Sequence, residues 1–326
     1  MPGLSSVASW DELPPSPAST SGSSATSFDD DEVNVRVQPY WPDYRNTLKL
    51  HGYRLETVQD AKDFYLVNAR CPVPESFLLK HGDDEPDALC HDSGLPENLF
   101  RGARARDRSV KVVVKAVHLH SRELGIIQTL ARSPLRDDPM NHCIPVLDVI
   151  ELPEDDLAFI VMEQWSSQLV VDSDPCCLRL FLAALRQAIE HVAFMHRHRM
   201  AHLDISLRNL LTDYRGHYAY IDYELSRKFE ALESPRICNF RTTEVPPECE
   251  TSNGDCPDAF KADVWAMGIL ILRASKLTGY CLPELVHLVR PMLNADPADR
   301  PSIEQVLVAF EKLVCTMQDL DRLHSL

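Results

Sequence analysis

The amino-acid sequence predicts an α+β fold in two lobes: a small β-rich amino-terminal lobe with one helix, and a larger, mainly α-helical carboxy-terminal lobe. Runs rich in apolar and β-branched residues, separated by polar breaks, occupy residues 97–117 and 142–162 and are typical of strands. From Asp174 onward the apolar residues follow a helical period. The chain has 326 residues, 44% of them hydrophobic, which is enough for two cores.

Composition divides the chain into four segments. Residues 1–34 are rich in Ser, Pro and Asp, a composition that predicts a disordered tail. Residues 35–90 contain many aromatic and leucine side chains, so we expect an amino-terminal extension packed on the main domain. We expect the amino-terminal lobe over residues 91–165 and the carboxy-terminal lobe over residues 166–326.

The amino-terminal lobe is expected to contain four strands and one helix. Residues 97–105 and 110–117 flank a polar turn, which is the pattern of a hairpin. Residues 121–132 begin with a serine, which caps helices well, and carry their apolar residues on one face. Two more strands are expected over residues 142–152 and 157–162.

Three patterns predict helices in the carboxy-terminal lobe. Residues 264–272 are apolar on all sides, which indicates a helix that is buried all round. Ser302 and Gln305 form a capping box at the start of the last helix. A stripe of apolar residues at helical spacing marks a third helix and consists of Phe181, Leu185, Ile189 and Val192.

Composition also excludes several classes of function. The net charge of −16 argues against nucleic acid or an anionic membrane as a partner, because both require clustered Lys and Arg. The longest apolar run, residues 264–272, is far shorter than the about 20 residues that span a bilayer. Ten cysteines lie scattered without a Cys-x-x-Cys pair, so we expect reduced thiols. We expect a soluble cytoplasmic protein, with the nucleus as an alternative compartment.

Three polar residues in apolar surroundings suit phosphoryl transfer: Asp204, Asn209 and Asp222. That reaction needs a carboxylate near the attacking hydroxyl and hard oxygen ligands for Mg²⁺. Lys115 lies inside an apolar strand, where a lysine is most often a solvated edge residue. Glu123 starts the following helix and makes an ion pair with Lys115 feasible, and such a pair would hold the lysine against nucleotide phosphates.

Seven short motifs follow one another along residues 90–315. They are Val112-Val113-Val114-Lys115, Glu123-Leu124-Gly125-Ile126-Ile127, His202-Leu203-Asp204 with Asn209, Ile221-Asp222-Tyr223-Glu224, Pro246-Pro247-Glu248, Asp263-Val264-Trp265-Ala266-Met267-Gly268 and Asp299-Arg300-Pro301-Ser302. In this order they resemble the motifs of eukaryotic protein kinases, and their wording is similar to that of divergent kinase-like proteins of fungi. The resemblance implies a bilobal protein-kinase-like fold. It also implies transfer of the γ-phosphoryl group of Mg-ATP to a hydroxyl of a protein substrate, on Ser or Thr in preference to Tyr.

The resemblance implies roles for individual residues. Lys115 would hold the α and β phosphates of ATP, and Glu123 would orient it. Asp204 would accept the hydroxyl proton, while Asn209 and Asp222 would bind Mg²⁺. Further cofactor-binding residues would be Met162 as gatekeeper, Glu163 at the start of the hinge that contacts adenine, and Leu211. Supporting roles fall to Glu248 and Arg300, as a buried ion pair under the activation segment, and to Asp263, behind the catalytic loop.

The sequence departs from the kinase pattern at several points. No glycine-rich loop precedes Lys115, and residues 93–98 include a proline, which predicts a weak backbone grip on phosphates and low ATP affinity. Ser206 replaces the lysine of Ser/Thr kinases, and loss of one such contact costs on the order of 10²–10³ in rate. Arg208 would compensate as a catalytic residue. Leu203 replaces an arginine, so control through a phosphorylated activation segment is not expected.

Glu224 replaces a glycine beside Asp222. It either tunes metal binding or points into solvent, and we favour solvent. Small-molecule kinases of the choline and aminoglycoside type look similar at this point, whereas the activation segment, residues 222–248, is typical of protein kinases. Within it, Thr242 lies one position from the threonine of Ser/Thr kinases. Two alternatives to a protein kinase stay open: a pseudokinase scaffold with weak or no catalysis and, with less support, a small-molecule kinase.

Overall fold

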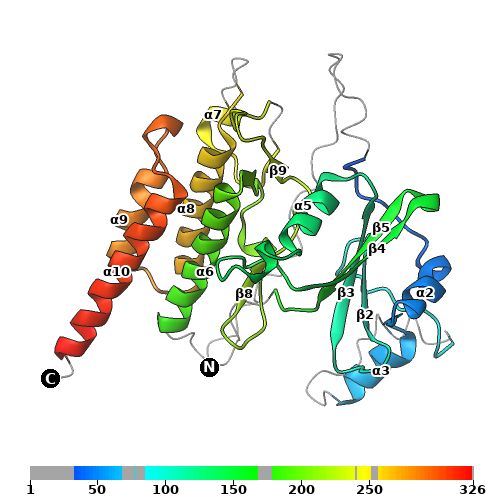
Figure 1. Ribbon diagram of the computed structural model, residues 1–326. Helices are drawn as coiled ribbons and strands as arrows, with labels where there is room; N and C mark the ends of the chain where they lie inside the picture. Colours follow the sequence, from blue (N-terminus) through cyan, green and yellow to red (C-terminus); the bar gives the residue numbers. More distant parts are fainter. Residues whose placement is uncertain are drawn as a thin grey trace, which may run out of the picture.

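A computed structural model of the protein describes residues 33–67, 77, 85–167, 178–238, 241–250 and 256–324. Within these ranges the chain forms two lobes, one built on an antiparallel sheet and the other on long helices (Figure 1). The predicted α+β fold is confirmed. The predicted tail, residues 1–34, lies outside the described residues except for its last two.

The amino-terminal lobe contains a five-stranded antiparallel sheet with the strand order β1-β2-β3-β5-β4. Strands β2 (Leu99–Arg104) and β3 (Lys111–His118) form the predicted hairpin. Strands β4 (Val146–Leu152) and β5 (Leu157–Glu163) form a second hairpin. Strand β3 is therefore an inner strand, with β2 on one side and β5 on the other.

Strand β4 begins later than the predicted start at His142. Residues 142–144 instead contact the other lobe, where the amide of Ile144 donates a hydrogen bond to the Tyr220 carbonyl at 3.0 Å. The strand also contains a bulge between Val146 and Asp148. Local composition does not distinguish a partner strand in the same sheet from a partner in another lobe.

The amino-terminal extension supplies the fifth strand. It contains α2 (Trp41–Leu50), β1 (Tyr53–Leu55) and α3 (Val58–Val67). Strand β1 pairs with β2 and forms one edge of the sheet. At this contact a side chain on Gly102 would collide with the carbonyl oxygen of Arg54, so glycine permits the close approach of the two backbones.

Trp41 fixes α2 on the sheet. Its ring centroid lies 5.3 Å from that of Phe100 and 5.5 Å from that of Phe159, and its indole nitrogen donates a hydrogen bond to the Glu97 carbonyl at 2.9 Å. Only 5% of the Trp41 side chain surface is exposed. The extension and the sheet thus share one hydrophobic core.

Helix α5 (Arg122–Leu130) is the helix predicted for the amino-terminal lobe. The hydroxyl of Ser121 caps it by accepting a hydrogen bond from the Leu124 amide at 3.3 Å. Its apolar face is buried, as the periodicity indicated. Glu123 lies in the first turn of the helix, where its Oε1 is 2.7 Å from Lys115 Nζ on β3.

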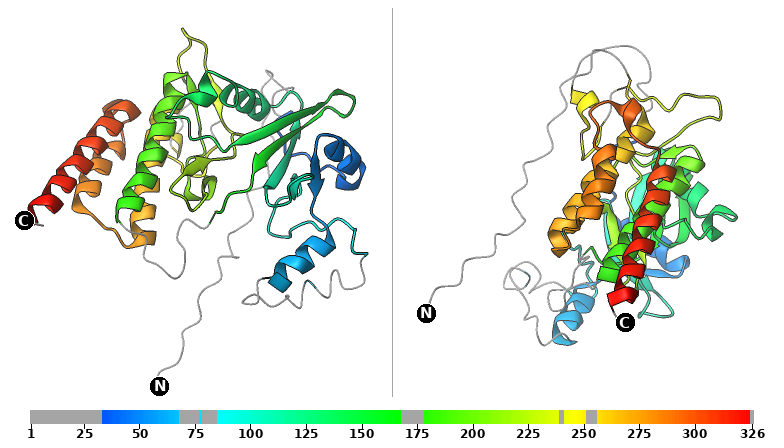
Figure 2. Two further views of the ribbon diagram at one scale, coloured as in Figure 1. Left: turned by 60° about the horizontal axis from the view of Figure 1, so that its bottom comes forward. Right: turned by 90° about the vertical axis from the view of Figure 1, so that its left-hand side faces the viewer.

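The carboxy-terminal lobe is built from α6 (Leu178–Arg197), α8 (Ala259–Thr278), α9 (Pro283–Met292) and α10 (Ile303–His324). These helices lie side by side, away from the sheet (Figure 2). The predicted stripe of α6 is buried. Helix α8 is buried along most of the predicted run, but Trp265 and Ile269 are half-buried and Leu272 is 36% exposed, so the predicted all-round burial is wrong at these three positions.

Short elements complete the fold. The capping box of α10 is confirmed, because the Ser302 amide donates to Gln305 Oε1 at 2.8 Å and the Gln305 amide donates to Ser302 Oγ at 3.3 Å. The short elements are η1 (Leu135–Asp137), η2 (Pro153–Asp155), β6 (Met200–Ala201) paired with β9 (Arg227–Lys228), η3 (Leu207–Asn209), β7 (Leu210–Thr212) paired with β8 (Tyr218–Tyr220), α7 (Pro247–Glu250) and η4 (Pro297–Asp299).

Cys238 and Cys256 form a disulfide. The prediction of reduced thiols is wrong for this pair. The spacing of the two cysteines in the sequence has no characteristic pattern, and backbone pairing brings them together: the Ile237 amide donates to the Pro257 carbonyl at 3.0 Å. Among the described residues, Cys143, Cys249, Cys281 and Cys315 lie outside this disulfide.

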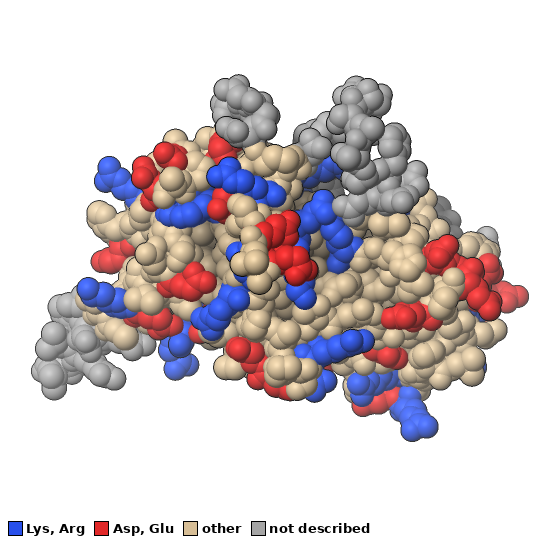
Figure 3. All heavy atoms as spheres, turned by 45° about the horizontal axis from the view of Figure 1, so that its top comes forward, with Lys and Arg blue, Asp and Glu red and all other residues tan. Residues whose placement is uncertain are grey.

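Charged side chains of both signs lie on the surface of the protein (Figure 3). On the face drawn in Figure 3, Lys and Arg side chains are interspersed with Asp and Glu rather than gathered into one basic area. Across the described ranges, each helix is too short or too polar to cross a membrane.

Candidate active site

A cleft between the two lobes contains most of the predicted site residues. It has a volume of about 230 Å³ and is open to solvent. Its walls come from β2, β3, α5 and β5 of one lobe and from the β7 and β8 region of the other. The predicted residues that line it are Lys115, Glu123, Met162, Glu163, Arg208, Leu211 and Asp222.

Lys115 is the central cation of the cleft. Its Nζ lies 2.7 Å from Glu123 Oε1 and 2.7 Å from Asp222 Oδ1. It is 7% exposed on an inner strand, so the alternative of a solvated edge lysine is wrong. The predicted strand-to-helix ion pair is confirmed, and it extends to a third residue from the other lobe.

The electrostatics of this triad follow from burial and from the opposite charges. Burial would lower the pKa of Lys115, but the carboxylates of Glu123 and Asp222 outweigh it and raise that pKa, so the ammonium is kept. Burial raises the pKa of Glu123 in spite of Lys115. For Asp222 the attraction to Lys115 outweighs burial and lowers the pKa, so this carboxylate stays ionised.

The loop that carries Asp204 is held from below by α8. Asp263 accepts hydrogen bonds from the backbone amides of His202 and Leu203, both at 2.8 Å. The expected supporting role of Asp263 is therefore borne out by its contacts. Leu203 has a left-handed backbone (φ 66°), which is unfavourable for a leucine, and the two bonds to Asp263 stabilise it.

Asp204 and Asn209 lie together at the end of this loop. The side-chain nitrogen of Asn209, in η3, donates to the Asp204 carbonyl at 2.9 Å and to Asp204 Oδ2 at 2.8 Å. These bonds turn the side-chain nitrogen of Asn209 toward Asp204, so Oδ1 is the atom of this side chain that could hold a metal ion. Both side chains are buried, at 8% and 7% exposure.

Thr243 is a site residue that the sequence did not single out. Its hydroxyl donates a short hydrogen bond to Asp204 Oδ1. The sequence pattern favours Thr242, but the Thr242 hydroxyl donates weakly to the Glu244 carbonyl at 3.4 Å. The sequence locates this threonine only by its distance from Glu248. A shift of one residue in the path of the activation segment therefore places Thr243 at Asp204 in place of Thr242.

Tyr223, beside Asp222, belongs to the core rather than to the cleft chemistry. Its hydroxyl pairs with His191 Nε2 at 3.0 Å, and its ring lies 5.0 Å from that of His202 at an angle of 39°. Burial lowers the pKa of His202, which keeps this imidazole neutral. His202 thus packs under the site and is not placed to transfer protons.

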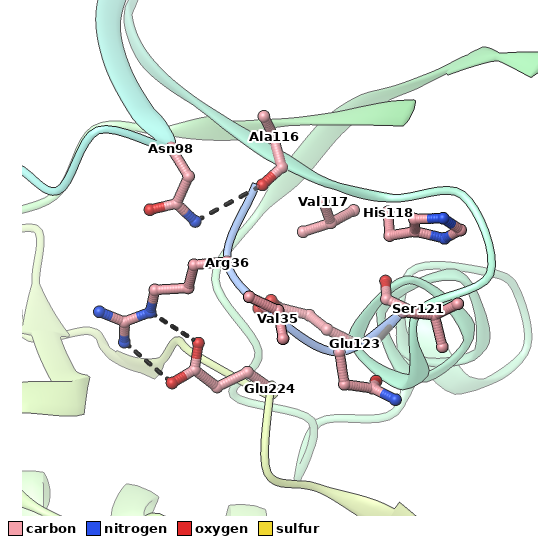
Figure 4. Close-up of a pocket in the computed structure, with 11 residues that line it drawn as sticks. Val35, Arg36, Asn98, Ala116, Val117, His118, Ser121, Glu123 and Glu224 are labelled. Carbon is pink, nitrogen blue, oxygen red and sulfur yellow. Dashed lines mark hydrogen bonds and ion pairs between the residues drawn. The ribbon is translucent and has the colours of Figure 1, made fainter. Parts of the chain in front are cut away.

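Glu224 faces an arginine instead of solvent. Its two carboxylate oxygens accept hydrogen bonds from Nε and Nη2 of Arg36, each at 2.9 Å (Figure 4). The prediction that Glu224 points into solvent is wrong. Arg36 also lies 3.6 Å from Asp222 Oδ2. Nothing in the local sequence around Arg36 indicates this contact, since it depends on how the extension crosses α5.

The activation segment ends on the expected ion pair. Arg300 donates to both carboxylate oxygens of Glu248, at 2.7 Å and 2.6 Å, and its guanidinium lies 4.9 Å from the ring centre of Trp265. Arg300 is 2% exposed. The predicted anchor is confirmed.

The turn before β2 lines the cleft and contains no glycine-rich loop. Leu95, Pro96 and Asn98 line the cleft ahead of β2. A proline offers no amide hydrogen, so this turn presents fewer backbone donors to a phosphate than a glycine-rich loop does.

Comparison with curated proteins identifies Ser/Thr kinases as relatives. CBL-interacting serine/threonine-protein kinase 13 of Arabidopsis thaliana is 30% identical over 148 residues, which cover 37% of this chain and 29% of the relative. CBL-interacting serine/threonine-protein kinase 18 of the same plant is 36% identical over 148 residues, covering 37% and 28%. Serine/threonine-protein kinase par-4 of Caenorhabditis elegans is 24% identical over 194 residues, covering 56% and 31%. The chain thus spans less than a third of the length of each.

A family model gives a more direct assignment. The model of the Protein kinase domain matches residues 103–280, which is more than half of the chain. The match includes Lys115 and Glu123 of the buried triad and both acidic residues of the catalytic and metal motifs, Asp204 and Asp222. The chain therefore belongs to the protein kinase domain family.

Proposed function

We propose that the protein transfers the γ-phosphoryl group of ATP to a serine or threonine hydroxyl of a protein substrate. The observation that carries the proposal is the triad in which Lys115 lies 2.7 Å from both Glu123 and Asp222. A scaffold has no need of a buried ammonium that joins two lobes beside an open cleft. The named relatives are Ser/Thr kinases, which favours that substrate class.

In this proposal each group has one task. Lys115 holds the α and β phosphates, and Asp204 accepts the proton of the substrate hydroxyl as its oxygen bonds to the γ phosphorus and ADP departs. Asn209 Oδ1 and Asp222 Oδ2 are the hard oxygen donors that Mg²⁺ prefers, and the ion would neutralise phosphate charge. The Thr243 hydroxyl already donates a hydrogen bond to Asp204, which supports the proposal that this carboxylate can accept a hydrogen bond from a substrate hydroxyl.

The alternative is a kinase-like scaffold with weak or no turnover. Two observations favour it: Leu95 and Pro96 stand at the roof of the cleft, and Ser206 replaces the lysine near the transferring phosphate. Loss of that lysine reduces the rate by on the order of 10²–10³ and leaves the base in place. A slow kinase therefore accounts for both observations.

Transfer of labelled γ-phosphate from ATP to a peptide library tests the proposal. The wild-type protein is expected to label Ser or Thr peptides with Mg²⁺ present, and Asp204→Asn and Asp222→Asn are expected to abolish labelling. Asp43→Asn, on the exposed face of α2, is the matched control and should label normally. Labelling that survives Asp204→Asn would remove the base from the mechanism. Nucleotide binding without labelling of any peptide would favour the scaffold.

A further inference from the structure

The cleft receives a side chain from outside the family domain. Arg36 precedes the matched region, residues 103–280, yet it lines the same cleft as Lys115 and Asp222. The segment that carries it crosses the first turn of α5, where the side-chain oxygen of Asn34 accepts a hydrogen bond from the Arg122 amide at 2.9 Å. Figure 4 shows Arg36 and Glu224 pointing toward one another.

Arg36 changes the charge balance where phosphates would lie. Glu123, Asp222 and Glu224 bring three carboxylates to this end of the cleft, and Lys115 alone would leave an excess of negative charge. Such an excess repels a polyanion. The hydrogen bond to Glu224 raises the pKa of Arg36, so the guanidinium is a permanent cation. Arg36 offsets the carboxylate that replaces the usual glycine.

The contacts of Arg36 leave it able to bind a ligand. Glu224 takes up Nε and Nη2 and fixes the plane of the guanidinium, whereas Nη1 is not part of that pair. The side chain is 52% exposed, so an incoming anion can reach it without unfolding the segment. Guanidinium groups bind phosphate oxygens strongly because their donors are charged and planar.

We propose that Arg36 is a phosphate-binding residue of the nucleotide site, positioned by Glu224. The side chain supplies the donors that a glycine-rich loop would otherwise supply, and its ligand is the polyphosphate of a nucleoside triphosphate. This inference rests on the proposed binding of ATP. It differs from a blocking role, in which Arg36 would occupy the site and exclude nucleotide.

Titration of nucleotides by calorimetry tests the assignment. Arg36→Ala is expected to weaken ATP binding on the order of 10- to 100-fold, as for a lost hydrogen bond to a charged group, and to leave AMP binding unchanged. Arg45→Ala is the matched control, because Arg45 lies in the same extension but pairs with Asp87. Equal or tighter ATP binding by Arg36→Ala would overturn the proposal, and tighter binding would identify a blocking residue.

Exchanging the charges of Arg36 and Glu224 distinguishes a direct role of the cation in ATP binding from a loss of folding. Arg36→Glu is expected to lose ATP affinity, and the double variant Arg36→Glu with Glu224→Arg is expected to recover part of it, because the cation returns from the other side of the pair. The unfolding temperature of the double variant shows whether it is folded. If that temperature equals the wild-type value and ATP affinity still does not recover, the proposal is contradicted. Wild-type protein that binds neither ATP nor inorganic triphosphate would overturn both this inference and the proposed function. Wild-type binding with no effect of Arg36 variants would overturn the inference alone.

Discussion

At the scale of residues, the buried triad couples the site to stability. Lys115→Met would leave the buried carboxylate of Glu123 and the partly buried carboxylate of Asp222 without their cation. Removing one partner of a buried ion pair costs about 3–5 kcal/mol of unfolding free energy. Urea unfolding measures this loss, and Lys111→Met, exposed on the same strand, is the control with an effect expected within about 0.5 kcal/mol.

The same variant is expected to depend on pH. Burial raises the pKa of Glu123, and the positive charge of Lys115 limits this rise. In Lys115→Met that charge is absent, so the pKa of Glu123 rises further. A carboxyl group with a raised folded pKa stabilises the fold below its ordinary pKa of 4.5, and this contribution is lost as the pH rises through the folded pKa. The deficit of Lys115→Met relative to wild type should therefore be smaller at pH 5 than at pH 8. A deficit independent of pH would contradict this.

Asp60, in the first turn of α3, gives the opposite pH dependence. Burial would raise its pKa, but hydrogen bonds from Arg54 and Thr57 outweigh burial and lower the pKa to about 2. Its contribution is present above the ordinary pKa of 3.8 and is lost as the pH falls through about 2. With solvent screening, Asp60→Asn is expected to cost about 1 kcal/mol at pH 7. Unfolding experiments at pH 7 and pH 3 should give a smaller gap at pH 3.

Single residues differ in how far the sequence could identify them. Lys115, Glu123 and Asp222 lie in motifs whose order predicts their meeting in one cleft. Arg36 and Thr243 lie in no such motif, and their contacts depend on the paths of the extension and the activation segment. Where a residue contacts a segment far away in the sequence, its sequence neighbours do not predict that contact.

At the scale of elements, the contact between β1 and β2 makes a sharp prediction about glycine. Gly102→Ala would force a side chain against the Arg54 carbonyl, and we expect a loss of about 1–3 kcal/mol. Gly125→Ala in α5 is the matched control: its new side chain meets nothing within 4 Å, and helix propensity favours alanine by about 0.5–1 kcal/mol. Thermal unfolding should move in opposite directions for the two variants. A shift in the same direction would show that the contact is not tight.

Elements also differ in how well the sequence predicts them. Helix α5 was predictable because Ser121 caps it and its apolar face is periodic. Strand β1 was not, since its three residues form a strand only where β2 offers an edge far along the chain. Pairing between distant segments determines such short strands, and their own composition carries little information about it.

At the scale of the whole molecule, the extension behaves as part of the amino-terminal lobe. Trp41→Ala would remove a ring that is 5% exposed and packs against Phe100 and Phe159, with an expected loss of about 3–5 kcal/mol. Tyr40→Ala, at a neighbouring position that is 69% exposed, is the control and should change little. Equal effects of the two variants in chemical unfolding would show that the extension does not share the core.

The order of the two lobes followed from the change of apolar period along the chain, and the family domain followed from its motifs. The docking of residues 33–55 did not follow from either, because aromatic content predicts that a segment packs but not where. The sequence therefore predicted the part of the cleft that contains Lys115 and the other motif residues. It did not predict the end of the cleft that Arg36 lines.

The sheet has a consequence for how the protein behaves in concentrated solution. One edge is β1, only three residues long, and the other is β4, which is interrupted by a bulge and carries Asp148 and Glu151. A strand from a second molecule needs a long, regular row of free backbone groups to add to a sheet. Neither edge offers one, so copies of the chain are poorly suited to join edge to edge into fibres.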